Sequence, residues 1–458
     1  MQDFRYETDS MGEIQVLNTH LWGAQTQRSL KYFNIGEEKM PIMVINALVL
    51  VKRAAAMANK DLGNLDPQVA TTIVKVCDQI LMGNLDDHFP LKVWQTGSGT
   101  QTNMNVNEVI ANQANQFLGQ PLGTKKPIHP NDHVNYGQSS NDCFPTAMHI
   151  ATVQSLKWQL FLSLEHFHKA LEEKAEAFKN FVKVGRTHLQ DAVPMTVGQE
   201  FSAFAQQIKM SIERLKECLK YLYPLAQGGT AVGTGLNCPP GFVEKFIDYI
   251  QEITDLPFTS APNKFEALAS HDALVNVSGG LNTLAVSCMK IANDIRWLAA
   301  GPRCGLGELH LPENEPGSSI MPGKVNPTQA EALTMICCQV MGNHTAITMA
   351  GSQGHFQLNV FKPVIIYNLL QSIQLLSDGC QSFTEHCLKG LTVNTMQLQR
   401  NFEQSLMGAA VLNPLIGYDQ AAKVAQTACA EHKTLEQVVV EKGIMTAEAF
   451  RKLQAQAL

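Results

Sequence analysis

One loop of the sequence combines small residues, two adjacent hydroxyls, an ammonium group and a carboxamide. It reads GSSIMPGKVNP from Gly317 to Pro327, and a helical pattern follows it. The backbone N–H groups of such a loop and the charge of Lys324 can bind an anion, and Ser318 or Ser319 can present a hydroxyl to it. A surface turn rich in glycine, proline and serine has the same composition. The loop alone therefore leaves an anion site and a surface turn both open.

Two known motifs built from these residue types do not fit the loop. A phosphate-binding P-loop needs four residues before its Gly-Lys pair and a hydroxyl after the lysine. Here five residues separate Gly317 from Gly323, and Val325 follows the lysine. A serine-hydrolase elbow needs Gly-x-Ser-x-Gly, which neither serine of the loop provides. What remains is an anion-binding loop with a hydroxyl beside Lys324 and Asn326.

Other polar segments could serve the same chemistry. They are Thr96–Asn103, Gln138–Asp142, Gly185–Asp191 and Gly228–Gly235. The first leads into a helical pattern, and the free N–H groups at a helix start attract anions. It lacks the third glycine of a dinucleotide-binding loop, and no clear strand precedes it, so a Rossmann fold is not indicated. A further segment, His129–Asp132, reads on its own as a cap or a turn.

The middle of the chain carries the strongest structural signal. Apolar residues recur every three or four positions over 153–178, 197–222 and 274–298, which is the spacing of long helices in a bundle. Helical patterns also cover 42–62, 69–82, 104–118, 328–350 and 360–388. No alternating strand pattern or hairpin turn competes in the bundle region. We expect a mainly all-α protein with three domains: a mixed, mostly helical domain over 1–138, a long-helix bundle over 139–395 and a small helical domain over 396–458.

The length of one predicted helix bears on how a site is assembled. The pattern from Cys143 to Phe178 covers about 36 residues, hence roughly 54 Å at about 1.5 Å per residue. Gln138–Asp142 precedes this helix and Gly185–Asp191 follows it. If the helix is straight, one chain cannot bring both segments into one pocket. They serve different sites, or several subunits of a symmetric oligomer share one site. Long apolar stripes favour the second alternative.

Composition excludes several classes of protein. The chain of 458 residues is 45% hydrophobic and 17% charged, with a net charge of −6, so a nucleic-acid partner is not expected. We find no apolar run of the roughly 20 residues that span a bilayer, and no signal or transit segment. Eleven cysteines at irregular spacing, without a Cys-x-x-Cys pair, indicate free thiols in a cytoplasmic protein. Neither a metal nor a cofactor is expected.

The loop and its companion segments together resemble the fumarase/aspartase superfamily. The residues that carry the resemblance are Gly317-Ser318-Ser319, Met321-Pro322, Lys324 and Asn326-Pro327, and the companion segments occur in the family's order. Gly323, followed by Thr328-Gln329-Ala330-Glu331, is similar to the class II, iron-independent fumarases. Aspartate ammonia-lyases usually carry alanine at the position of Gly323. The resemblance covers nearly the whole chain and implies the three-domain fumarase/aspartase-like fold.

The resemblance also implies roles for particular residues. The expected catalytic residues are His188, Ser318 and Glu331. The expected substrate-binding residues are Ser98, Thr100, Ser139, Ser140, Asn141, Thr187, Ser319, Lys324 and Asn326. A second dicarboxylate site is expected at Lys126, His129, Asn131 and Asp132. Each histidine or carboxylate taken alone would also fit a structural role.

The activity implied is the reversible hydration of fumarate to (S)-malate, a reaction of the tricarboxylic acid cycle. It would proceed by anti addition of water through an aci-carboxylate carbanion. The expected partners are the dicarboxylate substrate and identical subunits, in a homotetramer that shares its sites. Two alternatives stay open: an aspartate ammonia-lyase on the same scaffold, and an inactive structural homologue.

Overall fold

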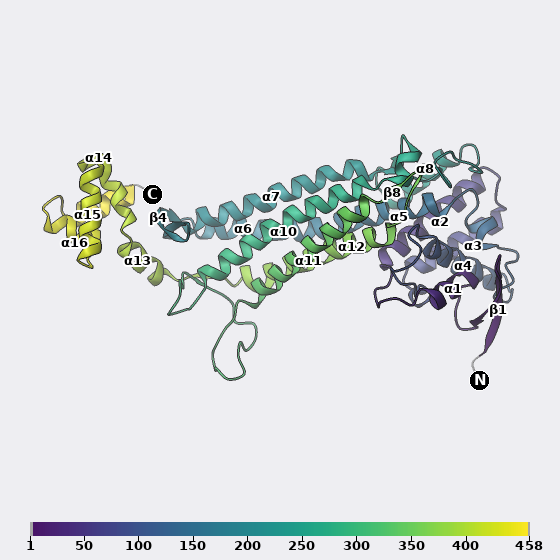
Figure 1. Cartoon of the computed structure of the whole chain (residues 1–458), viewed down its shortest axis with the longest axis horizontal. Helices are drawn as coiled ribbons and strands as arrows, with labels where there is room; N and C mark the ends of the chain where they lie inside the picture. The colour runs from purple at the N-terminus through teal and green to yellow at the C-terminus, as the bar shows by residue number, and fades with distance from the viewer. Residues whose placement is uncertain (1–2, 457–458) are drawn as a thin grey trace. The chain divides into compact units, whose positions relative to one another are not determined.

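The structure is a computed structural model that describes residues 3–456. Figure 1 shows that these residues form mainly α-helices, which confirms the fold class. The helices are α1 (Ala24–Tyr32), α2 (Ile42–Asp61), α3 (Pro67–Leu81), α4 (Thr100–Phe117), α5 (Ser140–Ser155), α6 (Phe161–Ala177), α7 (Val197–Leu222), α8 (Phe242–Thr254), α9 (Lys264–Ala269), α10 (Asp272–Leu298), α11 (Thr328–Gly351), α12 (Lys362–Phe383), α13 (Thr395–Gln404), α14 (Asn413–Ile416), α15 (Tyr418–Ala430), α16 (Leu435–Glu441) and α17 (Ala447–Gln456).

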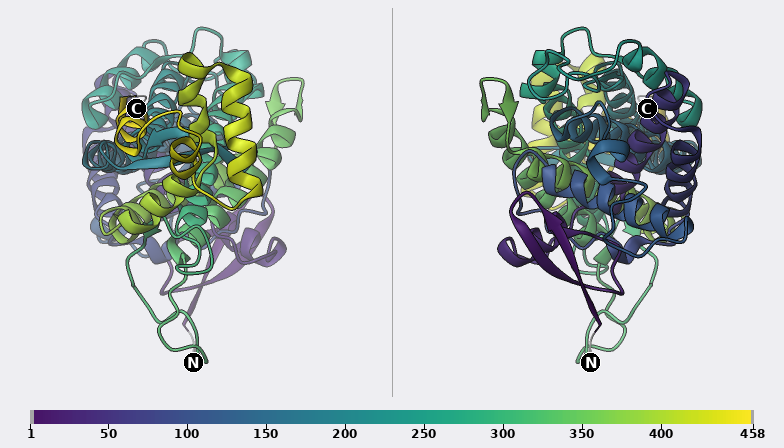
Figure 2. Two further views of the ribbon diagram at one scale, coloured as in Figure 1. Left: turned by 90° about the vertical axis from the view of Figure 1, so that its left-hand side faces the viewer. Right: turned by 90° about the vertical axis from the view of Figure 1, so that its right-hand side faces the viewer.

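The strands of the described chain are short and pair two at a time. They are β1 (Phe4–Asp9) with β2 (Gly12–Leu17), β3 (Val182–Thr187) with β4 (Gln190–Thr196), β5 (Pro224–Leu225) with β6 (Thr259–Ser260), β7 (Leu309–His310) with β10 (Thr392–Val393), and β8 (Gly354–His355) with β9 (Leu358–Asn359). The β5–β6 pair is parallel and the others are antiparallel. Figure 2 shows β1 and β2 as a twisted two-stranded ribbon.

The chain divides into two compact units. Unit 1 comprises residues 1–161, 213–283 and 339–376, and unit 2 comprises residues 162–212, 284–338 and 377–458. Several long helices contribute residues to both units. The three-domain boundaries at 138 and 395 stay a prediction.

Helix α2 forms the centre of unit 1. It packs against α3, α5 and α8. It is long and apolar enough to cross a membrane, but 72% of its most apolar window is buried inside the protein, as expected of a core helix. The Asp66 side chain caps α3 and Pro67 occupies its first turn.

The apolar stripes correspond to long helices. The stripes at 197–222 and 274–298 are α7 and α10, and α11 and α12 follow where the pattern predicts them. The first stripe is a continuous run of α5, a π-helical turn at Leu156–Leu160, and α6. Because helices of this kind bury the residues that recur every three or four positions, their apolar spacing identifies them without an alignment.

The expectation that residues 139–395 contain no hairpin is wrong, because β3 and β4 form one in unit 2. The strand has no alternation to detect, since the consecutive residues Lys183, Val184 and Gly185 are all buried. The ladder also shifts register between Val184 and Arg186. The turn lacks the Asn-Gly or Asp-Gly pair that marks a two-residue hairpin.

The C-terminal helices have an apolar core of their own within unit 2. Buried residues from η5 (Met407–Leu412) through α17 form it, including Leu412, Val424, Val439 and Phe450. Helix α13 packs against β3, and η5 packs against β4. This small helical segment therefore supports the β3–β4 hairpin.

A buried carboxylate anchors the first helix of unit 1. Glu108 on α4 accepts hydrogen bonds from the backbone N–H groups of Gly23, Gln25 and Thr26 at 2.9, 2.8 and 3.2 Å, and from the Thr26 hydroxyl at 2.6 Å. Burial raises its pKa, and these hydrogen bonds offset only part of that rise. Glu108 thus supplies the acceptor that the free N-terminus of α1 requires.

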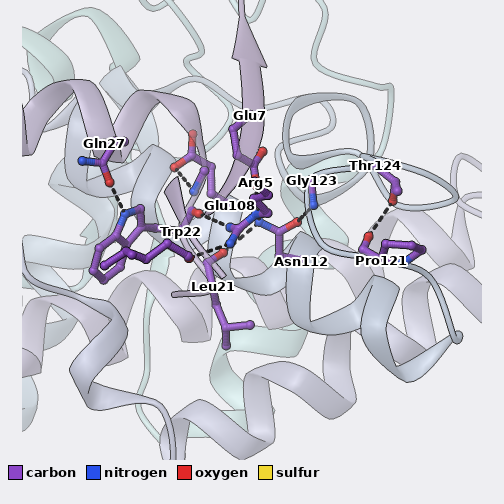
Figure 3. Close-up of polar contacts among 12 residues, drawn as sticks. Arg5, Glu7, Leu21, Trp22, Gln27, Glu108, Asn112, Pro121, Gly123 and Thr124 are labelled. Carbon is purple, nitrogen blue, oxygen red and sulfur yellow. Dashed lines mark hydrogen bonds and ion pairs between the residues drawn. The ribbon is translucent and has the colours of Figure 1, made fainter. Parts of the chain in front are cut away.

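Figure 3 shows the neighbouring contacts that join the N-terminal hairpin to α4. The Arg5 Nε donates to Glu7 Oε1 at 2.8 Å, and the Asn112 Nδ2 donates to the same oxygen at 3.2 Å. Arg5 also donates to the carbonyl of Trp22 at 2.7 Å. These contacts and Glu108 fix the N-terminal segment on α4.

Replacement of Glu108 by alanine should destabilise the protein by about 3 kcal/mol, because buried donors at the start of α1 would lose their acceptor. Thermal unfolding followed by calorimetry measures the change. Glu13→Ala, at an exposed position of β2, is the control and should leave the unfolding temperature nearly unchanged. Equal effects of the two substitutions would contradict the anchoring role of Glu108.

Candidate functional site

The first candidate turn of unit 1 brings two hydroxyls together at the start of α4. The Ser98 and Thr100 oxygens lie 2.8 Å apart, and Ser98 is only 9% exposed. A Cβ atom on Gly97 would lie 1.5 Å from the carbonyl oxygen of Val360. Gly99 has a φ of +78°. Both positions therefore require glycine, and the turn is fixed by the surrounding backbone.

The second candidate turn begins α5. Ser139 and Asp142 form a capping box: the Ser139 Oγ accepts from the Asn141 N–H at 3.2 Å, and Asp142 accepts from the Ser139 N–H at 3.0 Å. The Ser140 Oγ accepts from the Asn103 Nδ2 at 3.0 Å, which joins this turn to α4. Unit 1 thus holds its two hydroxyl-rich turns next to one another, as the sequence suggests.

The Asp142 carboxylate also holds a third loop. Its Oδ2 accepts from the N–H groups of Gly228 and Thr230 at 3.0 and 2.9 Å. The Asn141 side chain donates to the Ala231 carbonyl at 2.8 Å. Burial raises the pKa of Asp142, while the backbone hydrogen bonds lower it and leave a net rise. One buried carboxyl group therefore fixes both the α5 turn and the 228–231 loop.

Part of the expected second site lines a cavity of about 300 Å³ in unit 1. His129 and Asn131 line it together with Lys125, whereas Lys126 and Asp132 do not. The His129 Nδ1 accepts from the N–H groups of Asn131 and Asp132 at 3.1 and 3.2 Å. That nitrogen is therefore unprotonated, and the other ring nitrogen carries the hydrogen. Burial and the nearby Lys125 lower the pKa of His129, and Asp132 opposes them.

In unit 2, His188 stands in the turn of the β3–β4 hairpin. Thr187 pairs with Gln190, so His188 and Leu189 are the two central residues of the turn. Their φ angles are +57° and +60°, and both side chains are exposed. This left-handed conformation costs a residue with a Cβ atom about 1–2 kcal/mol. The turn therefore keeps a strained backbone that presents the imidazole to solvent.

A buried ion cluster supports this hairpin. Glu308, 1% exposed, accepts from Arg186 at 2.6 Å and from Asn401 at 3.0 Å, and it lies 3.2 Å from the Lys183 ammonium. Lys183 also contacts Glu200 at 2.7 Å. Burial alone would raise the pKa of Glu308, but Arg186 and Lys183 outweigh it and lower the pKa. The cluster fixes β3 two residues before His188.

The Gly317–Pro327 loop is closed at its base by two hydrogen bonds. The Gly317 N–H donates to the Lys324 carbonyl at 3.0 Å, and the Asn326 amide donates to the Gly317 carbonyl at 2.6 Å. Gly317 has no room for a side chain, since a Cβ atom would lie 2.3 Å from the Lys324 oxygen. Ser319 and Lys324 are exposed. Figure 1 shows the segment between α10 and α11 as a long loop.

Within this loop the Ser318 hydroxyl oxygen accepts two backbone hydrogen bonds. Its Oγ accepts from the N–H groups of Ile320 and Met321 at 3.2 and 3.1 Å. The loop encloses a hollow of about 440 Å³, lined in part by Ser318 and Lys324. Hydrogen bonds from N–H groups favour negative charge on the atom that accepts them. The loop thus places the Ser318 oxygen where two backbone donors favour charge on it, and anion binding by the loop stays a prediction.

Glu331 lies in the first turn of α11 and is exposed. No hydrogen bond joins it to His188 in the described part of the chain.

The candidate residues fall into two sets. Unit 1 holds Ser98, Thr100, Ser139, Ser140, Asn141 and the expected second site, and unit 2 holds Thr187, His188, Ser318, Ser319, Lys324, Asn326 and Glu331.

One charged residue next to these turns is not indicated by the sequence. Lys52 on α2 is 0% exposed, and its ammonium donates to Gln138 at 3.1 Å. A lysine inside an apolar run gives no sign that it is buried, so only the structure reveals it.

Comparison with known proteins identifies the family of the chain. Residues 12–342 match a family described as Lyase, and residues 409–455 match one described as Fumarase C C-terminus. The chain is 60% identical to a class II fumarate hydratase of Thermosynechococcus vestitus, over 98% of this chain and 96% of that protein. It is 58% identical to a mitochondrial fumarate hydratase of Danio rerio, over 98% and 88%. A class II fumarase of Schistosoma mansoni has the same fold, with a TM-score of 0.95 and 45% identity over 98% of both chains.

The chain therefore belongs to the fumarase/aspartase superfamily of lyases. Within that superfamily it is a member of the class II fumarate hydratase family. The resemblance drawn from the loop and its companion segments is confirmed.

Replacement of Glu308 by glutamine should cost about 3–5 kcal/mol of stability, because Arg186 would lose its buried counter-charge and Lys183 would keep only Glu200. The pKa of Glu308 is lower in the folded protein than in the unfolded protein, where it is near 4.5, so its ionisation stabilises the fold at pH values above 4.5. This stabilisation is lost as the pH falls through the folded-state pKa of Glu308. The difference in unfolding temperature between wild type and variant should therefore shrink below that pH. The exposed Glu313→Gln is the control, and a pH-independent difference would contradict the ionic origin.

Proposed function

We propose that the chain catalyses the reversible hydration of fumarate to (S)-malate. The observation that carries this proposal is its 60% identity, over 98% of its length, to a protein named class II fumarate hydratase. The Ser318 loop adds support, because a purely structural protein needs neither a hydroxyl that accepts two backbone N–H groups nor an exposed histidine on a strained turn. The same identity favours hydration over the elimination of ammonia from aspartate.

The chemistry explains why the site needs so many fixed donors. Malate must lose a proton from the carbon beside a carboxylate, and that carboxylate then takes up the charge as an aci-carboxylate. Donors aimed at this charge before it forms lower the barrier. We assign this role to Lys324 and Asn326 with Ser319 and Thr187. The other carboxylate and the hydroxyl are assigned to Ser98, Thr100, Ser139, Ser140 and Asn141.

Ser318 is proposed as the base that removes the carbon proton. A serine hydroxyl is a weak base, and the N–H groups of Ile320 and Met321 on its oxygen, with Lys324 in the same loop, favour its anionic form. The proton moves from carbon to Ser318 Oγ in the malate-to-fumarate direction. It returns by the reverse path during hydration.

His188 is proposed to act on the other face of the substrate, where it protonates the departing hydroxide or takes a proton from the attacking water. Its exposure on the β3–β4 turn leaves the imidazole free to do so. Glu331 is assigned to orient His188 and increase its basicity in the assembled site.

We further propose a homotetramer in which each site takes residues from several subunits. The α5–α6 helical run separates Ser139–Asn141 from Thr187–His188 along the chain. The apolar stripes of α7 and α10 are already buried within the chain, so the support for a shared site is the separation of the two residue sets by this helical run. The assembly supplies both residue sets to one substrate.

A second dicarboxylate site is proposed at the cavity lined by His129 and Asn131. Lys125, which lines the cavity, supplies the positive charge there in place of Lys126.

The eleven free cysteines fit a reducing compartment, and we assign the protein to the cytoplasm on that basis. A mitochondrial relative shows that the family also occurs elsewhere.

Malate offered to the purified protein should yield fumarate, measured by its ultraviolet absorbance, whereas aspartate should yield none. The expectation follows from the family match and from the glycine at position 323. Fumarate formed from aspartate alone would overturn the proposed reaction in favour of an ammonia-lyase. Fumarate formed from neither substrate would support an inactive homologue.

Ser318→Ala and His188→Asn should each reduce the hydration rate by roughly 10²–10⁴-fold, the usual contribution of a general acid or base. If different subunits supply the two residues to each site, refolding the two inactive variants together should restore roughly a quarter of the wild-type activity. A mixture that stays inactive, although size-exclusion chromatography shows mixed tetramers, would contradict this sharing. Ser318→Ala with full activity would remove Ser318 from the mechanism.

A further inference from the structure

The buried ammonium of Lys52 contacts the network that shapes the α5 turn. Its Nζ donates to Asn135 Oδ1 at 2.8 Å, to Gln138 Oε1 at 3.1 Å and to Cys143 Sγ at 3.4 Å. Three acceptors match the three N–H bonds of an ammonium group, whereas a neutral amine has only two. Lys52 therefore has an acceptor for each of its N–H bonds, although it is 0% exposed.

The acceptors of Lys52 connect it to α4 and to the α5 turn. Asn135 Oδ1 also accepts from the side chains of Asn103 and Asn107 on α4, each at 3.2 Å. Asn103 in turn donates to the Ser140 hydroxyl at 3.0 Å. The Asn135 amide donates to the Gln138 carbonyl at 3.1 Å, immediately before Ser139. Lys52 thus stands at the base of a continuous hydrogen-bond network that ends at the proposed carboxylate-binding groups.

Within residues 3–456, no carboxylate contacts the Lys52 ammonium directly. Its three acceptors are two amide oxygens and a thiol. The nearby Asp142 directs its oxygens to the backbone N–H groups of Ser139, Gly228 and Thr230 instead. An ammonium buried without an ion-pair partner is costly, and neutral residues could fill the same space. An anion bound at the neighbouring turns would gain from this charge, because a buried site screens it weakly.

We propose that Lys52 is a positioning and specificity residue for the dicarboxylate: it orients the Gln138–Asn141 turn and provides the positive potential that makes the site prefer a dianion to a monoanion. This inference rests on the proposed function, since it takes the α5 turn to bind a substrate carboxylate. Lys52 does not touch the substrate and acts through Gln138 and Asn135.

Calorimetric titration with two ligands separates the electrostatic role from a structural one. Succinate is a four-carbon dianion, and monomethyl succinate keeps the chain with one charge masked. Lys52→Met removes the charge and keeps most of the length, and Lys60→Met makes the same charge change at a half-buried position of the same helix. Lys52→Met should weaken succinate binding at least tenfold more than monoester binding, while Lys60→Met leaves the ratio of the two affinities unchanged.

Equal weakening of both ligands, or no weakening, in a folded Lys52→Met protein would overturn the inference. If that variant does not fold, Lys52→Gln replaces it, because the glutamine amide retains two N–H donors without the charge and carries the same expectation. Binding is measured without turnover, so the result is independent of the reaction. A wild-type protein that binds succinate but does not hydrate fumarate would refute the proposed function and leave this inference standing.

Discussion

Buried carboxylates that accept backbone N–H groups fix the turns on which this protein depends. Asp142 is fully buried and accepts from three N–H groups in two separate segments, so neither the α5 turn nor the 228–231 loop can shift alone. Glu108 likewise accepts backbone N–H groups at the start of α1. Glu308 holds β3 by accepting hydrogen bonds from side chains. A buried carboxylate without its donors costs several kcal/mol, so each of these turns is held in a single geometry.

This rigidity matters because the proposed reaction stabilises a charge that exists only briefly. Donors that already point at the aci-carboxylate need no reorganisation when it forms. The Ser98 and Ser140 hydroxyls, proposed to bind the other carboxylate, are held by the packing and hydrogen bonds around them. The proposed aci-carboxylate donors Ser319, Lys324 and Asn326 lie with Ser318 on one loop whose base is closed by hydrogen bonds, and His188 lies on a strained turn. Such strain is common at functional sites and is maintained by the surrounding structure.

Much of this arrangement can be predicted from the sequence, because long helices bury residues at a spacing that no other element shares. Features that lack this spacing are not predicted. The β3–β4 hairpin has consecutive buried residues around Lys183, since ion pairs make that lysine part of the interior, and its strand therefore shows no alternation. Lys52 lies in an apolar helix that is buried nearly all round, so the sequence shows no polar face on which to place it. The resemblance assigns Lys126 to the second site, whereas the cavity in the structure is lined by Lys125, a difference of one residue that the sequence does not show.

A crystal structure with succinate bound is the most direct test of a dicarboxylate site assembled from both residue sets. The account predicts that one carboxylate contacts Ser98, Ser140 or Asn141 of one subunit. It predicts that the other carboxylate lies within hydrogen-bond distance of Lys324 and Asn326 from another subunit. Succinate held by residues of only one set, or by one subunit alone, would contradict the shared site.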